Sequence, residues 1–258
     1  MPSDRVADAG SDTADEATPG LRSPLNVRIE DSGRDLVMLH GGGGGIDDLA
    51  ELCGLLGSGR RVISPDQRGH GRSPGGPEIS YAAQARETAE LLDDLDVKAA
   101  DIVGWSDGGI VGLLLARDRP DLVNRLVAIS ANAALESQPP ALTDRSREFL
   151  AAMKSNDLEM PAGRETLPGA AEEWPATATQ IVAMWRAGPE LAIADLGRIK
   201  APVLYLAADA DIVPTEHTVA MQRATPGAQL AILPGANHRL PQQRAAEVAA
   251  IVERFLAG

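Results

Sequence analysis

The chain is 258 residues long, which suits one large α/β domain with an insertion or two small domains, and we expect a single domain. Hydrophobic residues make up 44% of it, yet no stretch approaches the roughly 20 uninterrupted apolar residues that a membrane helix needs. A formal charge of −13 at pH 7 opposes binding to phosphate backbones and to anionic membranes, so we expect neither a nucleic-acid nor a membrane partner.

The first 20 residues are acidic and rich in Ala, Asp, Gly and Thr, and they lack the apolar core of a secretory signal. Residues 1–20 are therefore predicted to be a disordered acidic tail. Cys53 is the only cysteine, which excludes an intramolecular disulfide, and no ligand cluster of the zinc type is visible. We expect a cytoplasmic protein without a metal ion or a cofactor.

Apolar runs of strand length alternate with stretches of helical period, a pattern that predicts a parallel sheet covered by helices. Strands are expected at residues 25–29, 35–39, 61–64, 101–105, 122–129, 203–207 and 229–233. Helices are expected at residues 46–56, 81–95, 107–117, 215–224 and 242–255. Residues 131–196 interrupt the alternation with six prolines and short helical stretches, which indicates an insertion.

The hexapeptide GWSDGG at residues 104–109 contains G-x-S-x-G between an apolar strand and a helix. A serine at such a sharp turn has strained backbone geometry, and Gly104 and Gly108 leave the room that the turn needs. The following helix directs its free N–H groups and positive dipole end towards Ser106. We interpret Ser106 as a nucleophile; the alternative is an ordinary tight turn between strand and helix.

A serine hydroxyl needs a base within hydrogen-bond reach and a group that holds this base in the correct tautomer. His238 follows the last predicted strand, at the sheet edge where such a base would meet the serine, and is predicted to be the general base. Asp211, favoured over Asp209, is predicted to orient it. For either aspartate the alternative is an N-cap of the next helix. The other three histidines are expected in loops that shape the site or at a helix start: His40, His70 and His217.

The oxyanion formed during acyl transfer needs two backbone N–H donors. One is expected from Asp107, directly after the nucleophile. The other is expected from Gly42, because the five glycines at residues 41–45 let the backbone approach a substrate closely. A phosphate-cradling loop is the alternative for this run, but the Gly-Lys-Ser/Thr that would follow is missing.

Four motifs in chain order resemble those of the α/β-hydrolase fold superfamily, over approximately residues 21–258, and the fourth of them is the pair of loops that bear Asp211 and His238. HGG at 40–42 resembles its oxyanion loop, DQRGHGRS at 66–73 its D-x-R-G-x-G-x-S segment, and GWSDG at 104–108 its nucleophile elbow. The order Ser, Asp, His is also the order of this fold class. The elbow and the loops of the predicted acid and base are similar to those of small esterases and lactone or amino-ester hydrolases.

The resemblance implies a mixed, mostly parallel sheet of about eight strands flanked by helices. It implies a core of residues 21–130 and 197–258 and a helical lid of residues 131–196. Serine at the nucleophile position speaks against the haloalkane dehalogenase and epoxide hydrolase branches, which attack through a carboxylate. In this family the segment around Arg68 is structural, so it is assigned no chemistry.

We therefore predict a serine hydrolase, monomeric or homodimeric, that cleaves a small ester, thioester or lactone through an acyl-enzyme. Gly43, Trp105 and Trp185 are predicted to contact the acyl substrate. Five residues are candidates for an apolar wall over it, or alternatively pack the lid onto the core: Met153, Met160, Trp174, Met184 and Trp185. Two other functions stay open, namely non-hydrolytic chemistry such as carbon–carbon cleavage, cyclisation or elimination, and small-molecule binding without catalysis.

Overall fold

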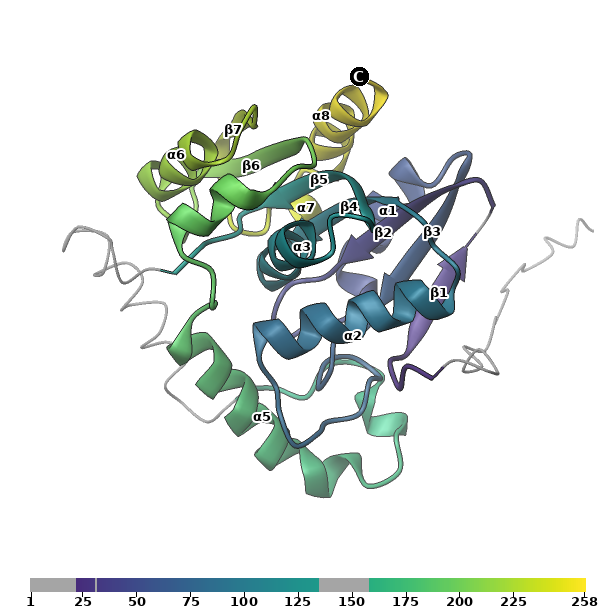
Figure 1. Ribbon diagram of the computed structural model, residues 1–258. Coiled ribbons are helices and arrows are strands. Elements are labelled where there is room, and N and C mark those ends of the chain that lie inside the picture. The colour runs from purple at the N-terminus through teal and green to yellow at the C-terminus, as the bar shows by residue number, and fades with distance from the viewer. Residues whose placement is uncertain (1–21, 31, 135–157) are drawn as a thin grey trace, which may run out of the picture.

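Seven strands form one sheet in the computed structural model, which describes residues 22–30, 32–134 and 158–258 (Figure 1). They lie in the order β1-β3-β2-β4-β5-β6-β7, with β1 antiparallel to β3 and the other neighbours parallel. The strands are β1 (Val27–Glu30), β2 (Arg34–Leu39), β3 (Arg60–Pro65), β4 (Ala100–Trp105), β5 (Val123–Ile129), β6 (Val203–Ala210) and β7 (Gln229–Asn237). The sheet is mostly parallel, as expected, and has seven strands in the described residues where about eight were implied.

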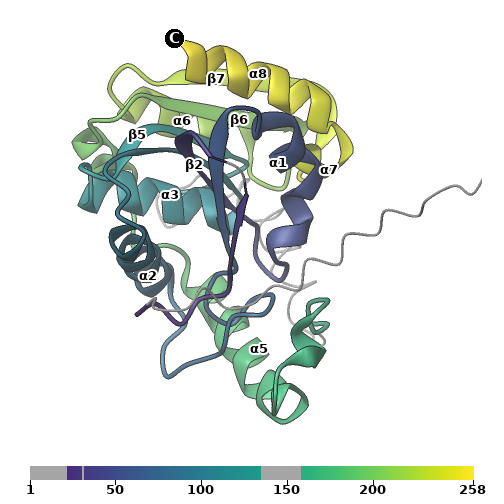
Figure 2. The same cartoon turned by 90° about the vertical axis from the view of Figure 1, so that its right-hand side faces the viewer.

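Two layers of helices cover the sheet (Figure 2). One layer consists of α2 (Tyr81–Asp94), α3 (Asp107–Asp118) and α6 (Thr215–Ala224), and the other of α1 (Ala50–Leu56), α7 (Leu240–Gln243) and α8 (Ala245–Ala257). Alternate residues of a strand point to opposite faces, so Val37 packs into the first core and Leu36 into the second. All six residues of β4 are buried because helices lie on both of its faces.

The predicted elements are present, with small differences at their ends. The helix expected at 46–56 begins with a 3₁₀ turn, η1 (Ile46–Leu49), before α1. The helix expected at 242–255 is divided at Arg244, whose φ of −133° interrupts the helical backbone between α7 and α8. The last strand is four residues longer than the expected 229–233, so it ends directly before His238.

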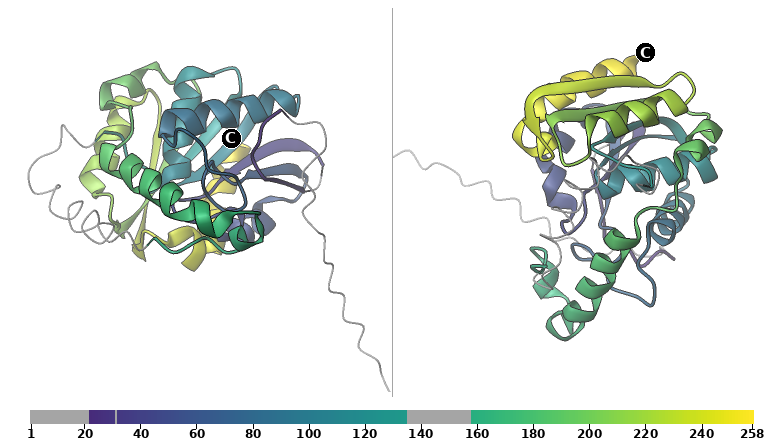
Figure 3. Two further views of the ribbon diagram at one scale, coloured as in Figure 1. Left: turned by 90° about the horizontal axis from the view of Figure 1, so that it is seen from below. Right: turned by 90° about the vertical axis from the view of Figure 1, so that its left-hand side faces the viewer.

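Between β5 and β6 the structure describes residues 130–134 and 158–202. These residues contain η3 (Arg164–Thr166), α5 (Ala170–Ala187) and η4 (Ile193–Arg198). Figures 1 and 3 place α5 outside the two helix layers, where it runs across the lower end of the fold. The expectation of only short helical stretches is wrong, since α5 is 18 residues long and continues through Pro175. Proline removes one helical hydrogen bond, and the buried side chains of Trp174, Ala178 and Ile181, at helical spacing, compensate for it.

Candidate active site

Ser106 lies at the turn from β4 to α3 with φ of +53° and ψ of −118°, a conformation that is rare for a side-chain-bearing residue. The turn is too tight for larger neighbours. A Cβ atom on Gly104 would lie 2.3 Å from the carbonyl oxygen of Gly108, and one on Gly108 would lie 2.2 Å from that of Leu39. The two glycines of G-x-S-x-G are thus required by the backbone, as the motif predicts.

His238 stands between Ser106 and Asp211. Its Nε2 lies 2.9 Å from the Ser106 Oγ, and its Nδ1 lies 2.7 Å from the Asp211 Oδ1. A neutral ring with its proton on Nδ1 satisfies both contacts, because Nδ1 then donates to the carboxylate and Nε2 accepts from the hydroxyl. The structure therefore brings together the three residues predicted as nucleophile, base and acid.

Asp211 is buried at the end of β6, with only 4% of its surface exposed. Its Oδ1 also accepts the backbone N–H of Val213 at 3.2 Å, and its Oδ2 accepts the hydroxyl of Ser130. Burial alone would raise the pKa of this carboxyl, but the hydrogen bonds from His238 and Ser130 and the charge of His238 outweigh burial and lower the pKa below its usual range. The group is thus a carboxylate throughout the neutral range.

Asp209 takes a different position from Asp211, although it is only two residues away. Its carboxylate accepts the backbone N–H groups of Gly235 and Ala236 at 3.0 and 3.3 Å. It therefore ties the end of β6 to the segment of β7 that leads to His238. Neither aspartate caps α6, because the N-cap position belongs to Pro214.

Asp107 and Gly42, the two predicted oxyanion donors, lie next to each other. A Cβ atom on Gly42 would lie 2.2 Å from the Asp107 Oδ2, so the glycine loop closely approaches the start of α3. The backbone N–H of Asp107 belongs to the first turn of that helix, whose N–H groups have no partner within the helix. Both of these residues therefore lie at the same end of the site as Ser106.

The Asp107 side chain is buried and joins three segments of the chain. It accepts the Tyr81 hydroxyl at 2.9 Å and the Trp185 indole N–H at 2.6 Å. Burial raises the pKa of this carboxyl, against the lowering effect of the two hydrogen bonds. Because Tyr81 begins α2 and Trp185 belongs to α5, one carboxylate links the core to the inserted segment.

The three residues predicted to contact substrate have different surroundings. Trp105 is 8% exposed, and its indole N–H donates to the main-chain oxygen of His238 at 2.8 Å, so it fixes the main chain at His238. Trp185 is half-buried and covers the glycine loop, with ring atoms 2.8 Å from a Cβ built on Gly42 and 3.5 Å from one on Gly43.

The residues predicted to form an apolar wall also differ in their surroundings. Met184 and Trp174 are 4% and 8% exposed and pack into the core, and the Trp174 indole N–H donates to the Leu158 carbonyl at 2.9 Å. Met160 lines a pocket, and Met153 lies outside the described residues.

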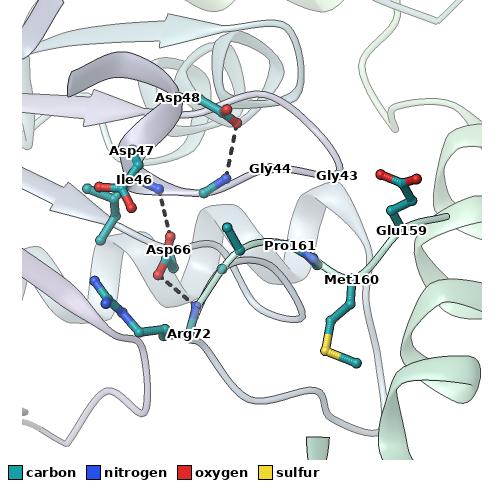
Figure 4. Close-up of a pocket in the computed structure, with 13 residues that line it drawn as sticks. Gly43, Gly44, Ile46, Asp47, Asp48, Asp66, Arg72, Glu159, Met160 and Pro161 are labelled. Atoms are coloured by element: carbon teal, nitrogen blue, oxygen red, sulfur yellow. Dashed lines mark hydrogen bonds between the residues drawn. The ribbon is translucent and has the colours of Figure 1, made fainter. Parts of the chain in front are cut away.

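This pocket has a volume of about 260 Å³ and lies beside the glycine loop (Figure 4). One side of it is formed by residues 43–48, and the other by Asp66, Gly71 and Arg72 and by residues 159–162. Its wall is well fixed, because Asp66 accepts the backbone N–H groups of Ile46 and Arg72, each at 2.8 Å. Ser106 and His238 do not line it, so it adjoins the candidate reaction centre without containing it.

The remaining histidines hold loops through their ring nitrogens. His40 has Nδ1 2.7 Å from the Gly41 carbonyl and accepts the Gln67 N–H at Nε2, which fixes the glycine loop against the next loop. His217 accepts the Ala133 N–H at Nε2. Burial lowers the pKa of His70 to about 3 and that of His217 to about 4, so both are neutral at physiological pH.

Two negative findings, on metal ions and on membrane helices, apply to the residues that the structure describes. They contain no group of three or more His, Cys, Asp or Glu side chains that could hold a metal ion. No helix among them is both long and apolar enough to pass through a membrane.

Sequence reasoning missed Ser130, Tyr81 and the role of Asp209. Ser130 had one usable signal, because it follows a predicted strand at the edge of a parallel sheet where site residues gather. The bond from Tyr81 to Asp107 spans 26 residues and that from Asp209 to Gly235 also spans 26, and neither follows from a local pattern.

Known proteins resemble this chain in both sequence and structure. It is 35% identical over 142 residues to the sn-1-specific diacylglycerol lipase ABHD11 of Mus musculus, covering 52% of this chain and 44% of that protein. It spans about half the length of the diacylglycerol lipases that it matches. It is 26% identical over 229 residues to the serine hydrolase BPHL of Mus musculus, covering 80% of this chain and 77% of the relative.

A crystal structure of a hydrolase from Pseudomonas aeruginosa PA01 superposes with a TM-score of 0.72 and 26% identity, covering 91% of this chain and 94% of the other. The model of the alpha/beta hydrolase family matches residues 36–251 of the sequence. This match includes the glycine loop, the turn that bears Ser106, and the loops that bear Asp211 and His238. The chain therefore belongs to the alpha/beta hydrolase family.

Proposed function

We propose that the protein is a serine hydrolase that cleaves a small carboxylic ester, thioester or lactone through an acyl-enzyme. The observation that carries the proposal is the position of His238, with one ring nitrogen at the Ser106 hydroxyl and the other at the Asp211 carboxylate. A hydroxyl, an imidazole and a carboxylate in this order are what an activated serine nucleophile needs. The names of the relatives, a serine hydrolase and a lipase among them, support the same class.

The reaction would begin when His238 Nε2 takes the hydroxyl proton and Ser106 Oγ attacks the substrate carbonyl carbon. The backbone N–H groups of Asp107 and Gly42 would hold the resulting oxyanion. The carbon–oxygen or carbon–sulfur bond to the leaving group then breaks, and His238 returns the proton to that group. A water molecule then loses a proton to the same nitrogen and attacks the acyl carbon. The bond from this carbon to Ser106 Oγ breaks, His238 returns the proton to Oγ, and a carboxylic acid is released.

We also infer that residues 131–196 act as a lid. The support is the bond between Trp185 and Asp107, which holds the inserted helix α5 against the residue that follows the nucleophile. The Trp185 ring then covers the glycine loop at Gly42, next to the place where the substrate carbonyl would lie. The lid would thus shape the acyl site, while the core carries out the chemistry.

The test measures initial rates on short-chain p-nitrophenyl esters for the native protein and Ser106→Ala, together with labelling by a fluorophosphonate. We expect turnover and labelling in the native protein and neither in the variant. Turnover that survives in Ser106→Ala would contradict the proposal. Labelling of Ser106 without turnover of any ester, thioester or lactone would instead favour non-hydrolytic chemistry, and absence of both would favour a binding protein.

A further inference from the structure

Ser130 directly follows β5 and has an unusual backbone conformation. Its φ is +51°, in the left-handed region that serine seldom adopts. Such a conformation persists where its surroundings hold it, and it is found preferentially at functional sites. The residue is 2% exposed, its N–H donates to the Leu206 carbonyl at 2.8 Å, and its hydroxyl donates to Asp211 Oδ2. The strained residue therefore points its only polar side-chain atom at the predicted catalytic acid.

The sheet order explains how Ser130 reaches this place. Strands β4, β5, β6 and β7 are consecutive neighbours, and Ser106, Ser130, Asp211 and His238 lie at or just beyond their carboxyl ends. The Ser106 N–H donates to the Ile129 carbonyl at 2.8 Å, which continues the ladder between β4 and β5. Ser130 thus lies between the strand of the nucleophile and the strand of the acid.

The two oxygens of Asp211 have separate sets of partners. Oδ1 faces His238 and also accepts the Val213 N–H. Oδ2 faces Ser130, and its other partner, the Ala208 N–H, is at the long distance of 3.4 Å. The terminal torsion of an aspartate is broad, so its rotation is set by what the oxygens contact. At Oδ2 the close contact is the Ser130 hydroxyl.

We propose that Ser130 is a positioning residue whose hydroxyl fixes the rotation of the Asp211 carboxylate, so that Oδ1 is presented to His238. The inference rests on the proposed function, because only a catalytic base at His238 needs an acid held in one orientation. By donating to the carboxylate, Ser130 also withdraws negative charge from it and limits how strongly it stabilises a protonated imidazole.

The other titratable groups near Asp211 are engaged elsewhere. Asp209 on β6 bonds the backbone of Gly235 and Ala236. His217 on α6 bonds the Ala133 N–H through Nε2. The titratable group in hydrogen-bond contact with Asp211 is His238, which follows β7. A change of pH dependence in a Ser130 variant therefore reports on the pair of Asp211 and His238.

The experiment compares Ser130→Ala and Ser130→Gly with the native protein between pH 5 and 9, by p-nitrophenyl ester turnover and by the rate of fluorophosphonate labelling. Both variants lack the hydroxyl, but glycine adopts a φ of +51° without strain, so Ser130→Gly tests the hydroxyl apart from the backbone. The matched control is Ser64→Ala, the same substitution at a serine in β3 that is 3% exposed and contacts Cys53.

We expect both Ser130 variants to lose about tenfold in kcat and in labelling rate, with KM changed less than about twofold, because a misoriented catalytic group slows chemistry more than binding. We expect the acidic limb of both profiles to move to higher pH, since the carboxylate loses a donor. Ser64→Ala should behave as the native protein.

Native rates and an unchanged acidic limb in Ser130→Gly would overturn the inference and assign Ser130 a backbone role alone. Losses of the same size in Ser64→Ala would overturn it too, because they would show a general effect of disturbing the sheet. Failure of the proposed function is distinguishable, since a native protein that neither turns over an ester nor reacts with the fluorophosphonate would disprove that function before any variant is compared.

Discussion

The sheet core and the described part of the inserted segment, residues 131–134 and 158–196, contribute to the site by different physical means. The core presents Ser106, Asp211 and His238 at the ends of neighbouring strands, where main-chain ladders fix their positions. The inserted segment contacts the start of α3 through Trp185, whose indole N–H bonds to the buried carboxylate of Asp107.

This contrast indicates that the core and the inserted segment have different roles. Catalytic geometry must be held to a fraction of an ångström, and side chains at the ends of hydrogen-bonded strands are held more precisely than those on loops. The segment supplies none of Ser106, Asp211 and His238, so its sequence can change without replacing a residue of this trio. We therefore expect substitutions in the core to abolish activity on every substrate, and substitutions in the segment to change which substrate is preferred.

The largest effect is expected from a comparison of the two aspartates. Asp211→Asn should lower kcat by about ten-thousandfold, because an amide would hold His238 in the wrong tautomer. Asp209→Asn should lower it only a few-fold, since Asp209 bonds to backbone N–H groups rather than to the base. The measurement is kcat on the best p-nitrophenyl ester, and equal losses in both variants would contradict the assignment.

A smaller loss is expected at the glycine loop, the proposed source of one oxyanion donor. Gly42→Ala should lower kcat by about a hundred- to a thousandfold, because the added methyl group would meet Asp107 and Trp185 and displace a donor. The matched control is Gly54→Ala in α1, where an added Cβ meets nothing within 4 Å. That control should keep full activity and raise the free energy of unfolding by up to about 1 kcal/mol through helix propensity. Equal activities of the two variants would show that the loop does not take part.

Trp185→Phe tests the contribution of the inserted segment. Phenylalanine keeps most of the apolar ring but loses the N–H that bonds to the buried Asp107 carboxylate. A hydrogen bond to a charged group is worth about 1.5–3 kcal/mol, so the free energy of unfolding should fall by that order, and KM should change unequally for short and long acyl chains.

Trp174→Phe serves as the control, because it removes an indole N–H that bonds to a neutral carbonyl, that of Leu158. It loses a bond worth about 0.5–1.5 kcal/mol together with ring volume from the core, and should leave the ratio of KM values unchanged. A uniform change of KM across substrates in Trp185→Phe would contradict a role in specificity.

The smallest effect is expected on the free energy of unfolding at acidic pH, through two buried histidines of the core. His70 and His217 have pKa values lowered to about 3 and about 4 by burial, and in the unfolded chain they bind protons near pH 6.5. Their stability contribution is complete above about pH 6.5 and is lost as the pH falls towards the folded values, by about 1.4 kcal/mol per pH unit for each histidine.

Urea denaturation at pH 6.5, 5.8 and 5.0 would measure this slope. His217→Gln should reduce the histidine part of it by about half. An identical slope in the variant would show that carboxylates, and not the buried histidines, cause the acid sensitivity.

The sequence predicts the core of this fold well because its signals are local. A strand such as β4 is a short apolar run, and the turn at Ser106 requires small residues at fixed positions beside it. The loops after β6 and β7 are predictable as the source of the acid and the base, because parallel strands bring their carboxyl ends to one edge. The choice of Asp211 over Asp209 agrees with the observed geometry, in which only Asp211 faces His238.

The contacts that the sequence does not reveal are those between distant segments. The bond from Ser130 to Asp211 spans 81 residues and that from Trp185 to Asp107 spans 78, so no periodicity encodes them. The length of α5 was underestimated because Pro175 is a poor helix residue, and burial of one face of the helix overrides this local preference.

The connection that carries α5 departs after β5 and returns at β6, and these two strands are hydrogen-bonded neighbours, with Leu126 opposite Val203 and Ile129 opposite Leu206. The chain therefore closes a loop whose two ends are already fixed by the sheet. Doubling the length of such a loop costs only about 0.6 kcal/mol in closure entropy. In evolution this connection can thus be lengthened, shortened or exchanged as a module, and new substrates become accessible to a lineage while its reaction chemistry is inherited unchanged.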